Sequence, residues 1–130
     1  MKQLTIVAAD RPGLMAEVTE LLAAEGINLE SFSAEAVAGT AVIRLTVDEY
    51  DKAIQALHRG GHSPVTEDSI LVRLESRPGA LAEVARRFRD AGVNIQSLRI
   101  IHTSGGRCVV ALATERTAEA VALVKDIMIS

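Results

Sequence analysis

Aromatic residues are almost absent from this chain of 130 residues, which has two Phe, one Tyr and no Trp. Its hydrophobic content of 48% is still enough for a compact core, which must therefore be aliphatic. The one cysteine, Cys108, excludes an intrachain disulfide framework and a paired-cysteine metal loop. No apolar run is long enough to span a membrane, and the apolar stretch near the start is too short for a secretory signal. We therefore expect a cytoplasmic protein that does not enter a membrane.

Positive charge is not in excess either, since the formal net charge is −3. A nucleic-acid-binding domain normally carries a basic patch, and an RNA-recognition sheet needs aromatic residues for base stacking. The sequence therefore argues against nucleic acid as a partner. His58, His62 and His102 show no metal-ligand spacing, and no spacing suggests a carboxylate pair, a Ser/His or a Cys/His arrangement. We expect neither an enzyme nor a metal or cofactor site.

An internal repeat is the most informative feature that the chain does contain. Residues 11–31 read RPGLMAEVTELLAAEGINLES, and residues 77–97 read RPGALAEVARRFRDAGVNIQS, an offset of 66. Nine of these 21 positions are identical. Because a repeat fixes the number of folding units, we predict two domains, of residues 1–66 and 67–130. A lone unit of about 60 residues is marginally stable, which favours packing of the two units on each other.

Both halves show the same order of hydrophobic patterns. Alternation predicts strands at 4–8 and 70–74, and Pro12 and Pro78 then begin amphipathic helices that end at a glycine. The later elements predicted are strands from Ile27 and over Val42–Val47, a helix over Tyr50–Leu57, strands from Val93 and over Cys108–Ala113, and a helix over Thr117–Lys125. The order β-α-β-β-α is the split βαβ arrangement. We therefore predict an α+β fold of two ferredoxin-like units, each an antiparallel sheet with its helices on one face.

The two halves differ at the fourth strand. Val65–Asp68 predicts a short one in the first half, whereas the second half has no residues to match it. Either Ile127–Ile129 forms a stub, or one sheet edge stays open, and an open apolar edge favours a homodimer. Gly39 and Gly105 keep the offset of 66, which predicts hairpins of equal length. Gly60–Pro64 is the predicted linker between the halves.

The Arg-Pro-Gly turn, the helix after it and the Gly-x-Asn that follows resemble the ACT domain family. Gly13 precedes Gly26 by 13 residues, and Gly79 precedes Gly92 by the same number. The resemblance implies small-molecule-binding regulatory modules of amino-acid metabolism, with a site at the interface between two such domains. The loop into the first helix would offer its backbone amides to a ligand carboxylate, as helix N-termini do for anions.

The resemblance also implies a set of ligand-binding residues in each half. They are Asp10, Arg11, Gly13, Leu14, Met15, Asn28 and Leu29 in the first, and Ser76, Arg77, Gly79, Ala80, Leu81, Asn94 and Ile95 in the second. Gly13 and Gly79 would let a ligand approach the backbone closely, because they lack a Cβ atom. Asp10 could meet an ammonium group but would repel a carboxylate, whereas Ser76 is neutral. We therefore expect two unequal sites.

Plainer roles are consistent with several of these residues. The two Pro-Gly pairs suit a simple strand-to-helix turn, and Asn28 and Asn94 suit hydrogen bonding to nearby backbone. Arg11 and Arg77 would be solvated or paired with a glutamate.

Three further residues have plain structural expectations. Glu17 and Glu83 lie on the polar face of the first helix of each half and are expected in solvent. Cys108, in an apolar strand, and Met15, in the first helix, are expected in the core.

Two functions from different classes follow. In the first, the protein is a non-catalytic sensor that binds an amino acid between its ACT units and regulates amino-acid metabolism. In the second, it is an interaction subunit that docks on a separate enzyme or transcriptional regulator. We expect a homodimer in both cases, and a thermal shift with amino acids separates the two.

Overall fold

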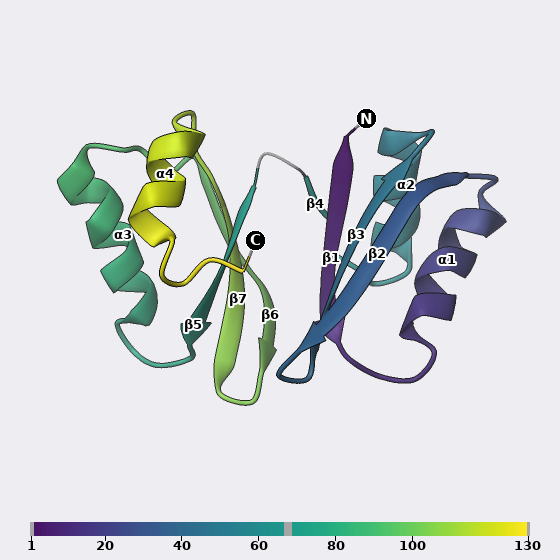
Figure 1. Ribbon diagram of the computed structural model, residues 1–130, viewed down its shortest axis with the longest axis horizontal. Helices are drawn as coiled ribbons and strands as arrows, with labels where there is room; N and C mark the ends of the chain where they lie inside the picture. Colours follow the sequence, from purple (N-terminus) through teal and green to yellow (C-terminus); the bar gives the residue numbers. More distant parts are fainter. Residues whose placement is uncertain (1, 67–68, 130) are drawn as a thin grey trace. The chain divides into compact units, whose positions relative to one another are not determined.

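The computed structural model describes residues 2–66 and 69–129, and the chain divides into two compact units between residues 67 and 68. The first unit contains β1 (Gln3–Ala9), α1 (Leu14–Ala24), β2 (Leu29–Val37), β3 (Thr40–Val47), α2 (Tyr50–Arg59) and β4 (Val65–Thr66) (Figure 1). The second contains β5 (Ile70–Glu75), α3 (Ala80–Ala91), β6 (Ser97–Ser104), β7 (Arg107–Ala113) and α4 (Thr117–Val124). The predicted α+β fold of two ferredoxin-like units is confirmed. Residues 67 and 68 of the predicted fourth strand lie outside the described residues.

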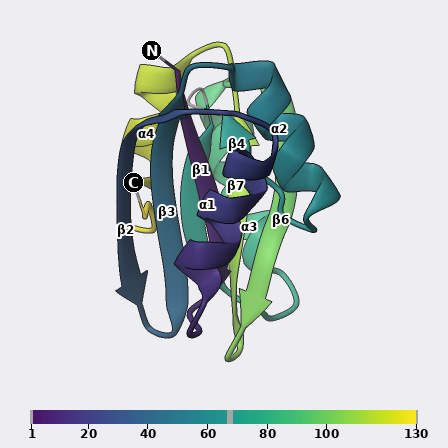
Figure 2. The same ribbon diagram turned by 90° about the vertical axis from the view of Figure 1, so that its right-hand side faces the viewer.

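The sheet of the first unit has the strand order β2-β3-β1-β4, and all its neighbours are antiparallel. Leu4 pairs with Leu45 and Ile6 with Ile43, so these four side chains lie on one face. Both helices of the unit cover this face, and Figure 2 looks onto them with α1 and α2 in front of the sheet.

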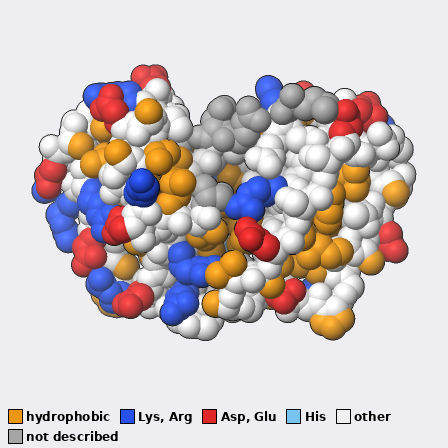
Figure 3. Space-filling view, viewed as in Figure 1, with side chains coloured by type: hydrophobic (Ala, Val, Ile, Leu, Met, Phe, Trp, Pro, Cys, Tyr) orange, Lys and Arg blue, Asp and Glu red, His pale blue; other side chains and the backbone are white. Residues whose placement is uncertain are grey.

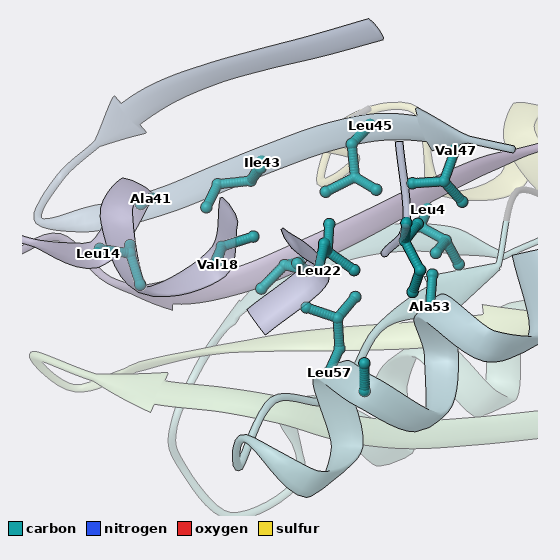
Figure 4. Close-up of a cluster of buried hydrophobic side chains, with 13 residues drawn as sticks. Leu4, Leu14, Val18, Leu22, Ala41, Ile43, Leu45, Val47, Ala53 and Leu57 are labelled. Atoms are coloured by element: carbon teal, nitrogen blue, oxygen red, sulfur yellow. The ribbon is translucent and has the colours of Figure 1, made fainter. Parts of the chain in front are cut away.

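An aliphatic core fills the space between this sheet and its helices, as predicted (Figure 4). Leu14, Val18 and Leu22 of α1 are fully buried. They are four residues apart, so they form one row along the helix. They face the alternate residues of β3, and α2 packs beside them. The β3 residues are Ala41, Ile43, Leu45 and Val47, and the α2 residues are Ala53 and Leu57.

Met15 is not part of this core, because 36% of its surface is exposed. It lies next to Leu14, about 100° further round the helix, and therefore outside the row that faces the sheet. The prediction of a core Met15 was wrong. Cys108 is 8% exposed and packs in the core of the second unit, so that prediction is confirmed.

The second unit repeats the design with the strand order β5-β7-β6. Val72 pairs with Val110, and Leu74 pairs with Cys108, on the face that α3 and α4 cover. Phe88 of α3 is 1% exposed and is the largest of the fully buried side chains among the described residues. One aromatic ring thus anchors a core that is otherwise aliphatic.

A stub at residues 127–129 takes the place of the fourth strand. Val72 and Met128 form an antiparallel bridge, the Arg73 amide donates to the Ile127 carbonyl oxygen at 2.9 Å, and the Ile129 amide donates to that of Leu71 at 2.8 Å. The chain returns to the sheet edge sooner than in the first unit, because α4 has 8 residues where α2 has 10 and the segment after it, residues 125–126, is shorter than residues 60–64. Of the two alternatives, the open edge is therefore wrong along Leu71–Arg73.

The two hairpins are not in register at the offset of 66. Their turns are Ala38-Gly39 and Gly105-Gly106, so Gly39 corresponds to Gly106 and not to Gly105. All four turn residues have positive φ, as the two-residue turns that favour the strand twist require. A bulge in β6 between Ile100 and His102 accommodates the additional residue, so the prediction of equal hairpins was wrong.

Three element boundaries also differ from the predicted ones. Residues 60–64 connect α2 to β4 inside the first unit, so they are not the linker between the halves. β2 begins at Leu29 and β6 at Ser97; Ile27 and Val93 lie in the loops that precede these strands and are buried there.

Basic and acidic side chains are interspersed on the face shown in Figure 3, with hydrophobic side chains gathered between them.

Candidate functional site

The Arg-Pro-Gly segments form two matching turns, one from β1 into α1 and one from β5 into α3. Gly13 has φ of 87° and Gly79 has φ of 86°, a left-handed conformation that glycine adopts without strain. A Cβ atom built on either glycine would meet nothing within 4 Å. The backbone conformation of the turn therefore requires these glycines, and the plain role as a strand-to-helix turn accounts for them.

In each turn, one of the backbone amides that we expected to bind a ligand carboxylate instead donates a hydrogen bond within the turn. The Leu14 amide donates to the Arg11 carbonyl oxygen at 3.3 Å, and the Ala80 amide donates to that of Arg77 at 3.2 Å. The first bond of the i−4 kind at each start is donated by Glu17 or Glu83. The second and third backbone amides are those of Met15 and Ala16 in α1, and those of Leu81 and Ala82 in α3. They have no acceptor four residues earlier within the helix, so they are the ones placed to bind an anion.

The turns are tied to the hairpins of their own units. The Asp10 amide donates to the Gly39 carbonyl oxygen at 2.9 Å, and the Ser76 amide donates to that of Gly106 at 2.8 Å. Asp10 and Ser76 are both exposed. The two copies therefore hold these side chains in equivalent places, with a carboxylate in one and a hydroxyl in the other.

The arginine of each turn pairs with the glutamate in the first turn of the helix. Arg11 Nη2 lies 2.8 Å from Glu17 Oε1, and Arg77 Nη2 lies 3.1 Å from Glu83 Oε1. The arginines are therefore paired, which is one of the two roles expected of them. The side chains of Glu17 and Glu83 are 38% and 49% exposed, so both glutamates reach solvent as expected, and each also binds its arginine. Hydrogen bonds from Arg11 and then from His62 hold the pKa of Glu17 below its usual value.

His62 is a residue of this region for which sequence reasoning found no role. Its side chain is 8% exposed, and its Nε2 lies 2.7 Å from Glu17 Oε2. The bond joins the segment after α2 to the first turn of α1. The repeat offered no signal for it, because the residue 66 positions later is Met128.

The asparagines lie at the other end of the helices. The backbone amide of Asn28, beside the start of β2, donates to Asp48 Oδ1 at 3.0 Å. Asn94 lies in the loop between α3 and β6. α1 has 11 residues, so at 1.5 Å per residue the turn and Asn28 are separated by roughly 16 Å. Within one unit, Asn28 and Leu29 are therefore not brought to Asp10–Met15, nor are Asn94 and Ile95 brought to Ser76–Leu81.

A cavity of about 100 Å³ lies beneath the second turn. Ser76, Arg77, Ala80 and Leu81, four of the predicted residues, are among those that line it. Sequence reasoning did not include Ile100 of β6, which also lines it, because β6 is distant from the turn along the chain. The fold therefore brings these four residues to one pocket.

A second cavity, of about 200 Å³, shares Arg77 with the first and also contains Glu83 and Arg87. Glu83 binds Arg77, and Asp126 binds Arg87 at 2.7 Å. Hydrogen bonding to Asp126 raises the pKa of Arg87 above its usual value. The guanidinium groups of Arg77 and Arg87 are thus already paired with carboxylates, and the same holds for Arg77 in the smaller cavity.

Two negative findings apply to residues 2–66 and 69–129. No group of three or more His, Cys, Asp or Glu side chains is arranged to hold a metal ion. Over the same residues, none of the helices has the length and apolar character needed to cross a membrane.

The chain is thus a tandem repeat of one βαββα unit, and each copy has a glycine turn at the start of its first helix. The family model of the ACT domain matches residues 2–59 and again residues 69–126. The chain therefore belongs to the ACT domain family, and a regulatory, ligand-binding role follows from that membership.

Solved structures with similar folds include protein BT0572 from Bacteroides thetaiotaomicron, 28% identical over 96% of this chain and 86% of that one, with a TM-score of 0.49. The ligand-free regulatory subunit of aspartate kinase from Thermus thermophilus is 22% identical over 96% of this chain and 91% of its own, with a TM-score of 0.45. The aspartokinase alpha and beta subunits are 19% identical, over 96% and 90%, with a TM-score of 0.43. No curated protein matches the chain.

Proposed function

We propose that this protein is a regulator of amino-acid metabolism that binds an amino acid at an interface between ACT domains. The observation that carries the proposal is the second turn, where Ala80 and Leu81, the first residues of α3, line a cavity of about 100 Å³ and the amides at the helix start suit an anion. The amides suit a carboxylate, and Glu75, Ser76 and Arg77 supply polar groups beside them. The role is regulatory and not catalytic.

The position of the asparagines supports a site between domains. Asn94 and the turn at Ser76–Gly79 lie at opposite ends of α3. A ligand that touches both kinds of residue must therefore lie between the turn of one domain and the asparagine of another. That second domain is either the other half of the chain or a second copy, as in a homodimer.

A thermal-shift screen of the whole protein against the twenty amino acids tests the proposal. A ligand at 100 times its dissociation constant adds about 2.7 kcal/mol of stability, which raises the melting temperature by several degrees. If no amino acid shifts the melting temperature, sensing is rejected. The alternative, a subunit that docks on an enzyme or a transcriptional regulator, then becomes the better proposal.

Two matched variants test the position of the site once a ligand is found. Asn28→Ala and Asn94→Ala both remove an exposed amide side chain, so the fold should be kept. Loss of one hydrogen bond should weaken binding roughly tenfold in the copy that is active. Unchanged affinity in both variants would contradict the interface site.

A further inference from the structure

Two long strands stand at the edges of the sheets. The edge strands are β2 and β4 in the first unit and β5 and β6 in the second. β4 has only two residues, and the stub at residues 127–129 covers part of the outer side of β5. β2 has nine residues and β6 has eight, and within residues 2–66 and 69–129 no further strand pairs with their outer sides.

β2 and β6 lack two of the residues that commonly protect an edge, since neither strand contains proline or lysine. Instead they carry three of the four exposed large hydrophobic side chains of the described residues. These are Phe32 at 37%, Val37 at 38% and Ile100 at 58% exposure. Exposed apolar side chains on an edge strand favour pairing with another strand, because pairing removes their surface from water.

Each strand has a segment of regular register. The irregularity in β2 lies between Leu29 and Ser31, and the bulge in β6 lies between Ile100 and His102. Residues 31–37 and residues 97–100 are therefore regular and can each accept a partner strand.

The helix-covered faces of these two segments are both apolar at the edge. Phe32 and Ala34 lie on this face of the first sheet, because they are opposite buried core residues of β3. Leu98 and Ile100 lie on the corresponding face of the second sheet, opposite core residues of β7. An antiparallel pair of β2 and β6 that keeps the helices on one side has a register in which Phe32 is opposite Ile100 and Ala34 is opposite Leu98.

The helix-free faces carry opposite charges. Ser33 and Glu35 lie on this face of β2, and Arg99 lies on that of β6. In the same register Arg99 is opposite Ser33 and diagonal to Glu35, a separation of about 7–8 Å that long side chains span. Glu35 binds Arg44 at 3.1 Å but keeps 60% of its side chain exposed, and Arg99 has no ion-pair partner among the described residues.

Charge also distinguishes this pairing from the symmetric ones. β2 contains two glutamates and no basic residue, whereas β6 contains an arginine and no acidic residue. Pairing of β2 with β2, or of β6 with β6, therefore brings like charges to one junction, which is destabilising.

We propose that two copies of this protein associate through these edges, with β2 of one copy antiparallel to β6 of the other. Phe32 and Ile100 form the apolar centre of the junction. Each copy supplies one edge of each kind, so the pairing is crosswise and not like with like. The inference goes beyond the proposed function, because the association requires no ligand.

Two lysine variants and their mixture test the crosswise junction. Phe32→Lys blocks β2 and leaves β6 intact, whereas Ile100→Lys blocks β6 and leaves β2 intact, because a lysine on an edge opposes strand pairing. Both side chains are exposed, so circular dichroism should show that both variants remain folded. Ile100→Val is the matched control, because it keeps an apolar β-branched side chain at the same position.

Sedimentation velocity at micromolar concentrations, without any amino acid, gives the measurement. The unaltered protein and Ile100→Val should associate, and each lysine variant alone should have a dissociation constant raised roughly tenfold or more. An equimolar mixture of the two lysine variants should associate again, because the intact β6 of one meets the intact β2 of the other.

Every other result overturns the inference. A monomeric unaltered protein rejects the junction and leaves amino-acid sensing standing. A lysine variant that associates alone with unchanged affinity shows that copies pair like with like or through another surface. A mixture that stays dissociated rejects the crosswise arrangement.

Discussion

Replacement of Gly79 by alanine should destabilise the second unit through the backbone alone. The φ of Gly79 is 86°, and a built Cβ atom meets nothing within 4 Å, so the cost has no steric contribution from neighbours. The left-handed conformation costs an L-residue about 1–2 kcal/mol. For a unit of about 60 residues, this lowers the melting temperature by roughly 4–16 °C.

Gly79→Asn provides the matched variant, because asparagine tolerates the left-handed region better than alanine does. Thermal unfolding of the ligand-free protein followed by circular dichroism should give the order glycine, asparagine, alanine from most to least stable. The same order is expected at Gly13, whose φ is 87°. Equal stability of the glycine and alanine proteins would contradict a backbone requirement for Gly79. The alternative, that Gly79 leaves room for a ligand near the backbone, would then be favoured.

Three further predictions concern the hairpin, the core and the ion pair. Ala38→Gly should raise the stability of the first unit by about 0.5–1 kcal/mol in thermal unfolding, because Ala38 has φ of 52°; a loss would contradict this. Phe88→Ala should cost about 3–5 kcal/mol in urea unfolding, whereas Phe32→Ala, 37% exposed, should cost far less; similar costs would show that Phe88 is not the anchor. The pKa of Glu17 is lowered on folding by Arg11 and then by His62, so its stabilising effect is present above the ordinary value of 4.5 and lost as the pH falls through the lower folded value. Glu17→Gln should therefore flatten the fall in melting temperature between pH 6 and 3, and parallel curves for the two proteins would contradict the pairing.

The sequence predicted the fold because its signals are local and occur twice. The repeat gave the number of units, the i, i+4, i+8 row of Leu14, Val18 and Leu22 gave the helix, and alternation gave the strands. The Arg-Pro-Gly turn was also readable, because proline and glycine each favour one backbone conformation. The family resemblance rested on the same residues and was confirmed by the family match.

Tertiary structure decided what depends on residues distant in the chain. The bulge in β6 moved the turn of the second hairpin by one residue, which no count along the sequence could show, and the folding of the sheet brought Ile100 to the cavity beneath the second turn. The shorter α4 brought Met128 to the edge of β5, and the fold brought His62 to Glu17 across 45 positions. Local pattern determines which elements form, because it acts through neighbouring residues. The register between strands and the walls of a cavity arise from contacts between elements, so they exist only once the chain has folded.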